Sequence, residues 1–343
     1  MKILILKPSS LGDVIQALPV LRHLRRAYPD AEIRWWIAEG LAPLLEGDPD
    51  LDGVIPFARG SWFRPRETGK MLGQIAGLRG QHYDWVIDLQ GLFRSGLFAW
   101  LSKGSHVIGL ENLKEGAPAF FDQSVPRPSS EAHAVDWYLS VLDVMGVPRE
   151  GEIDWLPERH DISDPIKRAW NLSEGPLISL VPGARWKNKR WPVSYFQELV
   201  LSLAQSHPDC RFAILGGAGD HEMGDQIAAI SPTRCIDLTG KTDLLQLIEW
   251  VRYSSLLVTN DTGPMHVGAA LNTPMVSIFG PTKPSHTGPY GMVDSVLQEK
   301  LLPCVPCMKS SCREKVWQDC LVRVTPAMTL AAVARELSKQ DGA

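Results

Sequence analysis

Short apolar runs alternate with amphipathic helical patterns along the first half of the chain. Residues 2–7 form an apolar run, and the turn-like PSSLG separates it from a helical pattern that extends from Asp13 to Tyr28. Pro19 falls inside this pattern and should kink the helix or detach its first turn. The same order recurs, which is typical of a parallel sheet covered by helices on both faces. Further strands are predicted at 32–37, 84–89 and 106–109, and helices at 67–79, 94–103 and 131–145.

A second series of the same kind follows a polar stretch. Residues 147–175 contain three prolines, many charges and few periodic apolar positions, so we place the interdomain connection there. We predict two Rossmann-like α/β domains, 1–160 and 161–343, with the last helix as a candidate to return to the first domain. A ligand cleft is expected between them, at the carboxyl ends of the strands. The predicted strands are 177–181, 211–215, 235–238, 255–259 and 275–279, and the helices are 194–206, 220–230, 243–252, 264–271 and 327–338.

Length and composition agree with this division. A chain of 343 residues fits two domains at roughly 100–200 residues each. The formal net charge of −4 does not favour nucleic acid as a partner. No apolar segment approaches the roughly 18–20 residues that a membrane span needs, and the first residues, MKILILK, do not form a signal peptide. We therefore expect a cytoplasmic protein.

The strongest candidate site is TNDTGPMHVGAA at 259–270. An apolar run leads into Asp261, Thr262 and Gly263, and a helix is predicted to begin beside Pro264. The backbone N–H groups at such a helix start form an anion site, and His266 lies in the first turn, where it can face a phosphate. The alternative interpretation is a capped helix with a core-facing histidine.

A basic segment, PGARWKNKRWP at 182–192, follows the first predicted strand of the second domain. Arg185, Lys187, Lys189 and Arg190 concentrate positive charge at a strand carboxyl end, where it could neutralise a diphosphate. A solvated basic loop is the alternative.

The segment LGGAGDHE at 215–222 is rich in glycine, but its spacing is not GxGxxG, and no GxxxxGK[ST] motif occurs. A dinucleotide site is therefore weakly supported. Glu222, in the first turn of the next helix, could accept a hydrogen bond from a sugar hydroxyl. A tight turn that leads into a helix explains the pattern equally well.

The N-terminal segment KPSSLGDVIQALP at 7–19 places Gly12 and Asp13 at a helix start. Glycine permits close backbone approach, and a carboxylate there is favoured by the helix dipole by about 0.3–1 kcal/mol. Asp13 is thus either a helix-end charge or a general base.

Two patterns could indicate metals. Asp48 and Asp50 form a D-x-D, which we interpret as structural because it lies in a loop that leads into the strand-like GVIPF. Four cysteines near the C-terminus could bind a structural zinc. Their spacing is irregular, however, so reduced thiols are the preferred interpretation. These cysteines are Cys304, Cys307, Cys312 and Cys320.

Taken together, the motifs resemble glycosyltransferase family 9, the lipopolysaccharide heptosyltransferases. The resemblance covers almost the whole chain in one order, and the KRWP form and cysteine-bearing tail are more similar to the second heptosyltransferase than to the first. The matching segments are KPSSLGDVIQALPVL, DLDGVIPF, DWVIDLQGLFRSG, VPGARWKNKRWP, LGGAGDHE, the Thr239–Thr242 turn and VTNDTGPMHVGAA with PMVSIFGPTKP.

The resemblance implies a GT-B fold and a metal-independent, inverting transfer of heptose from ADP-heptose to the lipopolysaccharide inner core, with no cofactor. It implies Asp13 as the base and Lys189 as the diphosphate contact. It further implies donor contacts from Glu222, Thr242, Asp261, Thr262, Gly263 and His266. We add Arg185 of the basic segment as a candidate donor contact, and Ser9, Ser10 and Gly12 of the N-terminal segment as candidate acceptor contacts.

The implied acceptor is anionic, and the basic segment FARGSWFRPRETGK at 57–70 could bind it. Arg59, Arg64 and Arg66 are candidate contacts, because arginine suits carboxylates and phosphates in bidentate geometry. Surface charge alone is the alternative. The implied location includes peripheral contact with the inner face of the cytoplasmic membrane.

Three other functions remain open from the sequence. A related GT-B transferase could use another nucleotide sugar or acceptor. A non-catalytic sugar-nucleotide-binding protein would not need both Asp13 and Lys189. An NAD-linked oxidoreductase is disfavoured by the missing GxGxxG.

Overall fold

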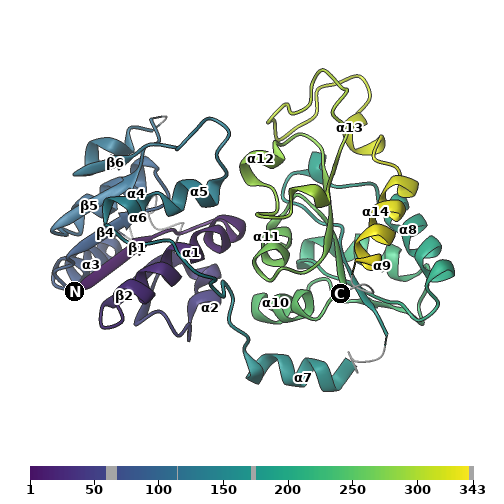
Figure 1. Ribbon diagram of the computed structural model, residues 1–343, viewed down its shortest axis with the longest axis horizontal. Helices are drawn as coiled ribbons and strands as arrows, with labels where there is room; N and C mark the ends of the chain where they lie inside the picture. The colour runs from purple at the N-terminus through teal and green to yellow at the C-terminus, as the bar shows by residue number, and fades with distance from the viewer. Residues whose placement is uncertain (59–67, 114, 171–174, 340–343) are drawn as a thin grey trace. The chain divides into compact units, whose positions relative to one another are not determined.

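A computed structural model describes residues 1–58, 68–113, 115–170 and 175–339. The chain divides into two compact units, Met1–Pro157 and Glu158–Ala343 (Figure 1). Within the described ranges, no helix combines the length and the apolar character that crossing a lipid bilayer requires.

The first unit is built on a six-stranded parallel sheet of order β3-β2-β1-β4-β5-β6. Ile3 on β1 pairs with Ile33 on β2 and with Trp85 on β4, so β1 lies at the centre. The strands are β1 (Lys2–Leu6), β2 (Glu32–Ala38), β3 (Gly53–Phe57), β4 (Trp85–Asp88), β5 (His106–Leu110) and β6 (Gln123–Val125). The α-helices are α1 (Leu11–Ala27), α2 (Ala42–Leu45), α3 (Thr68–Arg79), α4 (Phe93–Leu101), α5 (Ala134–Leu139) and α6 (Val141–Val144).

Aromatic stacking organises one face of this sheet. The ring of Trp36 lies 4.2 Å from that of Phe57 and 4.4 Å from that of Phe98, between centroids. Leu4 and Leu6 belong to the same buried cluster. The alternate residues of β1 are buried as well. Because successive side chains of a strand point to opposite faces, both faces of the sheet are covered.

The second unit repeats this plan, with strand order β12-β11-β10-β7-β8-β9. Its strands are β7 (Leu177–Val181), β8 (Arg211–Ile214), β9 (Cys235–Asp237), β10 (Leu256–Asn260), β11 (Met275–Phe279) and β12 (Val296–Gln298). Its α-helices are α7 (His160–Trp170), α8 (Val193–Ser206), α9 (His221–Ala228), α10 (Leu244–Arg252), α11 (Gly263–Ala270), α12 (Pro284–Thr287), α13 (Asp319–Val322) and α14 (Pro326–Ser338).

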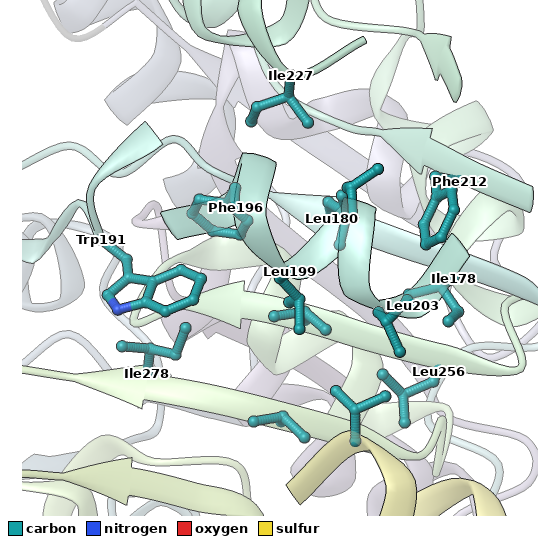
Figure 2. Packing of buried hydrophobic residues seen from close by; sticks show 14 of the residues in the cluster. Ile178, Leu180, Trp191, Phe196, Leu199, Leu203, Phe212, Ile227, Leu256 and Ile278 are labelled. Carbon is teal, nitrogen blue, oxygen red and sulfur yellow. The ribbon is translucent and has the colours of Figure 1, made fainter. Parts of the chain in front are cut away.

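One hydrophobic core of the second unit lies between this sheet and helices α8, α9 and α14. Phe196, Leu199 and Leu203 recur on one face of α8 and pack toward Ile178 and Leu180 of β7 (Figure 2). Burying each such side chain contributes about 1.5–3 kcal/mol. Ala332 and Val333 of the C-terminal helix α14 belong to the same buried cluster, so this helix is part of the core of the second unit.

Both sheets reverse their strand order at one central pair. In the first unit this pair is β1 and β4, and in the second it is β7 and β10. Ligands of open α/β sheets bind at the carboxyl ends of the strands that flank such a reversal. The fold thus points to the segments that follow these four strands.

The predicted strands and helices of both series are present. The structure adds strands and short helices that were not predicted, namely β6, β12, α2, α12 and α13, and it differs in the following elements. Helix α1 runs through Pro19 without a break. The helix expected at 131–145 is divided into α5 and α6. Helix α7 occupies part of the stretch that we interpreted as a connection. The buried side chain of Ile166 stabilises this helix despite the surrounding charges and Pro165. That stretch is therefore not entirely a linker.

Candidate functional site

The segment after β1 positions Asp13. Its Oδ2 accepts a hydrogen bond from the backbone N–H of Ser10 at 2.8 Å, so Asp13 stabilises the start of α1 as the helix-end interpretation predicts. Its Oδ1 lies 3.4 Å from the hydroxyl of Tyr138, which donates to it. One carboxylate oxygen of Asp13 is thus structural, and the other belongs to a second network.

Lys7 forms the buried part of that network. Its side chain is 2% exposed, and Nζ donates to Leu89 O at 2.8 Å and to Tyr138 Oη at 2.9 Å. Burial lowers the pKa of Lys7, while the charges of Asp13 and Asp88 act in the opposite direction. Burial raises the pKa of Asp88 to about 6, even though backbone N–H groups donate to it. Asp13 therefore lies at the edge of a buried, titratable cluster.

A cavity of about 290 Å³ opens beside Ser9 in the first unit. Gln90 and Arg94, which follow β4, lie in its wall. Gln90 Oε1 is buried and has no hydrogen-bond partner among the residues that the structure describes. Ser10 is exposed and Gly12 is buried. The cavity is lined by Pro8, Ser9, Trp36, Phe57, Gln90, Leu92, Arg94 and Ser95.

Ser9, Arg59, Arg64 and Arg66 all belong to the predicted acceptor site. Ser9 borders the cavity. Arg59, Arg64 and Arg66 lie outside the described residues.

In the second unit, the structure brings Lys189 and Asp261 together. Lys189 Nζ lies 2.6 Å from Asp261 Oδ2, and the hydroxyl of Thr282 also donates to this oxygen. The lysine follows β7, the aspartate follows β10 and the threonine follows β11. Three neighbouring strands therefore deliver one cation, one carboxylate and one hydroxyl to the same point.

Asn260 fixes the loop that carries Lys189. Its Oδ1 accepts from Trp191 N at 3.0 Å, and its Nδ2 donates to Pro182 O at 2.8 Å. The Trp191 ring is buried, and its Nε1 donates to Val324 O at 2.7 Å. Both ends of the basic loop are thereby tied to the end of β10.

Helix α11 begins at Gly263, two residues after Asp261. Thr262 is its N-cap residue, Gly263 is its first residue, and Pro264 lies within the first two positions. The helix dipole and the N–H groups of this end favour an anion. His266 is buried in the first turn. The N-terminus of α11 and Lys189 meet through Asp261, which makes this region the best candidate for a phosphate group.

The glycine-rich turn after β8 packs against the basic loop. Asp220 Oδ2 accepts from Gly217 N at 3.0 Å, and Asp220 Oδ1 lies 3.8 Å from the Arg190 guanidinium. A Cβ at Gly183 would lie 2.4 Å from the Asp220 carboxyl carbon, so a larger residue there would have to displace the Asp220 side chain. The turn therefore serves to hold the loops together.

Three predicted donor contacts have side chains without a protein partner among the described residues. Arg185 and Glu222 are exposed, and the side chain of neither makes a hydrogen bond or an ion pair with another described residue. Thr242 Oγ1 is buried and has no hydrogen-bond partner in the described ranges. Their polar groups remain available to a ligand.

The candidate metal ligands have protein partners. The guanidinium of Arg22 binds both oxygens of Asp48 at 2.6 Å and one oxygen of Asp50 at 2.8 Å, which accounts for the D-x-D structurally. His221, Asp225 and Asp237 form the one group of three potential ligands, within the described ranges, whose donor atoms lie within 4.8 Å of one another. Lys241 Nζ already lies 2.8 Å from Asp237, however.

Sequence analysis missed Lys7, Tyr138, Gln90, Arg94 and Thr282. Four of these residues could have been found from their positions, because each lies shortly after a predicted strand. Lys7 follows β1, Gln90 and Arg94 follow β4, and Thr282 follows β11. Tyr138 lies on α5, far from Asp13 in sequence, and no local pattern reveals the contact.

Known proteins resemble this chain over nearly its full length. A family model described as glycosyltransferase family 9 (heptosyltransferase) matches residues 72–318. Lipopolysaccharide heptosyltransferase 1 of Pseudomonas aeruginosa is 30% identical, with 91% of this chain and 87% of the relative covered. Lipopolysaccharide heptosyltransferase 2 of Escherichia coli is 28% identical, with 99% and 100% covered. The solved structure of E. coli ADP-heptose LPS heptosyltransferase II superposes with a TM-score of 0.80 at 26% identity, covering 99% of this chain and 100% of the other. The predicted GT-B fold class is confirmed.

Proposed function

The chain belongs to glycosyltransferase family 9, and from this we propose that it transfers heptose from ADP-heptose to the inner core of lipopolysaccharide. The observation that carries the proposal is the meeting of Lys189, Asp261 and the N-terminus of α11 where the second sheet reverses its strand order. Similarity to heptosyltransferases over almost the whole chain supports the choice of sugar and acceptor.

The second unit is proposed to bind the donor. The leaving ADP gains negative charge as the bond between the anomeric carbon and the phosphate oxygen breaks. Lys189 and the N–H groups of α11 are suited to stabilise this charge. Asp261 competes with the diphosphate for Lys189, and Thr282 offers Asp261 a second partner when the lysine turns to the ligand. Arg185, Glu222, Thr242, Thr262, Gly263 and His266 are proposed as further donor contacts.

The first unit is proposed to bind and activate the acceptor. An acceptor hydroxyl attacks the anomeric carbon, a new carbon–oxygen bond forms with inversion, and Asp13 takes the hydroxyl proton. No covalent enzyme intermediate is needed. Tyr138 donates to Asp13 Oδ1, so it can orient the base.

The cavity beside Ser9 suits part of an anionic sugar. Arg94 supplies positive charge and Gln90 Oε1 an acceptor for a hydroxyl. Ser10, Gly12, Arg59, Arg64 and Arg66 complete the proposed acceptor contacts. Since the acceptor is lipid-anchored and the donor is a nucleotide sugar, we place the reaction at the cytoplasmic face of the inner membrane, with peripheral contact.

Transfer from ADP-heptose to truncated lipopolysaccharide tests the proposal, with other nucleotide sugars as parallel donors. We expect product with ADP-heptose, detected by a mass increase of one heptose on the acceptor. Transfer from a different nucleotide sugar alone would assign another donor. Binding of ADP-heptose with no transfer to any acceptor would favour a non-catalytic binding protein.

A further inference from the structure

Four cysteines surround one cavity in the second unit. Cys304, Cys307, Cys312 and Cys320 all line a cavity of about 290 Å³, and none of them is in a disulfide. They lie in the segment between β12 and the end of α13, which forms the loops beside α13 in Figure 1. The irregular spacing of these residues favoured reduced thiols in the sequence. Their convergence on a single cavity changes that preference.

The shared cavity brings four potential thiolate ligands together. Four thiolates in one cavity repel one another, and a divalent cation removes this repulsion.

The surroundings of the cavity suit a negatively charged metal–thiolate group. The backbone N–H of Gln318 donates to Cys312 Sγ at 3.5 Å, a contact that stabilises a thiolate ligand. Lys309 and Arg313 line the same cavity with two positive charges against the one negative charge of Glu314, so the charged lining is net positive. The site therefore contains a sulfur ligand set, a hydrogen bond to sulfur and compensating charge.

We propose that Cys304, Cys307, Cys312 and Cys320 bind one zinc-type divalent ion in a closed tetrahedral site. Four thiols release four protons to solvent, and four thiolates with Zn²⁺ leave a net charge of −2. In a tetrahedral site with Zn–S bonds of about 2.3 Å, the sulfurs are about 3.8 Å apart. No three of these described sulfurs lie within 4.8 Å of one another, so metal binding requires the sulfurs to move closer together.

The position of this site gives the metal a structural role near the donor residues. Asn188 Nδ2 donates to Lys309 O at 2.9 Å, and Gln318 Nε2 donates to Lys187 O at 2.5 Å. The cysteine segment thus holds the short turn that carries Lys189 from two sides. A closed site has no open coordination position, so the ion would stabilise this turn without entering the transfer reaction.

Elemental analysis of the full-length, tag-free protein tests the proposal. Protein purified from zinc-supplemented cells is expected to hold about one zinc or iron ion per chain. The double variant Cys304→Ser, Cys312→Ser is expected to lose it. Cys235→Ser is the matched control, because Cys235 is also a free cysteine of the second unit but lies on β9 and does not line this cavity. This variant should keep its metal.

Cobalt provides a second measurement that does not depend on a variant's folding. Parent protein stripped by a mercurial reagent, restored with dithiothreitol and loaded with Co²⁺ should show the intense visible bands of tetrahedral cobalt and sulfur-to-cobalt charge transfer. Absence of zinc and iron in the parent, together with no such spectrum, would overturn the proposal. Equal metal content in the double variant and in Cys235→Ser would overturn it as well.

Discussion

Lys189 Nζ lies 2.6 Å from Asp261 Oδ2, so the lysine that we propose to bind the diphosphate is already paired with a carboxylate. The Lys189 side chain is 17% exposed and that of Asp261 6%, which places the pair at the edge of the protein interior. An ion pair there is screened less than one at the surface. A bound diphosphate must therefore attract Lys189 more strongly than Asp261 does. The diphosphate carries more negative charge than one carboxylate, and the N-terminus of α11 also favours an anion at this point.

Replacing Lys189 should weaken donor binding and slow transfer. Hydrogen bonds to charged groups contribute about 1.5–3 kcal/mol, so Lys189→Ala should lower kcat/KM for ADP-heptose by roughly 10- to 150-fold. Lys187→Ala is the matched control, since Lys187 is an exposed lysine of the same turn and should have little effect. Steady-state kinetics and ADP calorimetry would measure this. Parent-like kinetics for Lys189→Ala would remove the residue from the site.

Asp13→Asn should abolish transfer and leave ADP-heptose affinity nearly unchanged. The asparagine oxygen can still accept from Ser10 N, so α1 should retain its start, while the proton acceptor is lost. Single-turnover assays combined with calorimetry separate the two effects. Turnover close to that of the parent would show that Asp13 is only a helix-end charge.

The raised pKa of Asp88 predicts a pH-dependent difference in stability. Its pKa is about 6 in the fold, against 3.8 for an ordinary aspartate, so the folded state binds the proton more tightly. The stability that this proton gives is present below about pH 4 and is lost as pH rises through about 6. Two units correspond to up to about 3 kcal/mol.

Asp88→Asn should therefore gain stability relative to the parent between pH 4 and pH 7. The asparagine oxygen can still accept from Gln90 N and Gly91 N. Urea unfolding of both proteins at each pH gives the difference directly, because the other titrating groups are common to both. A constant difference across this range would mean that Asp88 is charged throughout.

Transfer should survive brief treatment with EDTA, and added magnesium should not increase it. The carboxylates of the D-x-D are bound by Arg22, and Lys189 with α11 is proposed to provide the charge that a metal provides in other transferases. Initial rates with and without chelator measure this. A loss of activity that magnesium restores would assign a catalytic metal.

Neutralising Arg59, Arg64 and Arg66 together should raise the acceptor KM several-fold and leave the donor KM unchanged. Attraction between exposed charges is screened beyond a Debye length of about 10 Å at 0.1 M salt, so the effect should shrink as salt is added. Acceptor titrations at low and high salt test both points. An unchanged acceptor KM at low salt would make these arginines surface charge only.

Much of the fold could be predicted because the central strands are continuous apolar runs. β7 and β11 are buried at every position, and their predicted bounds match the structure. β6 and β12 have three residues each, too few for a periodic signal. Helix α7 was hidden by Pro165, since proline inside a helical pattern argues against a helix.

The segments that form the candidate site could be predicted, but the contacts between their side chains could not. The rule for parallel sheets places the segments after β7 and β10 together, which brings Lys189 near Asp261. That these two side chains pair, and that Tyr138 reaches Asp13, depends on rotamers and on packing between distant segments. Sequence patterns alone carry no such information.

The side chain of Asn260 binds both Pro182 and Trp191, and this has a consequence for protein engineering. The two hydrogen bonds of the Asn260 side chain fix the distance between Pro182 and Trp191. An insertion or deletion in the loop between these two residues would therefore displace Lys189 or break one of the two bonds. The loop can be replaced by the corresponding loop of a relative only when the two loops have the same length. Donor preference should therefore be altered by substitutions that keep the length of this loop.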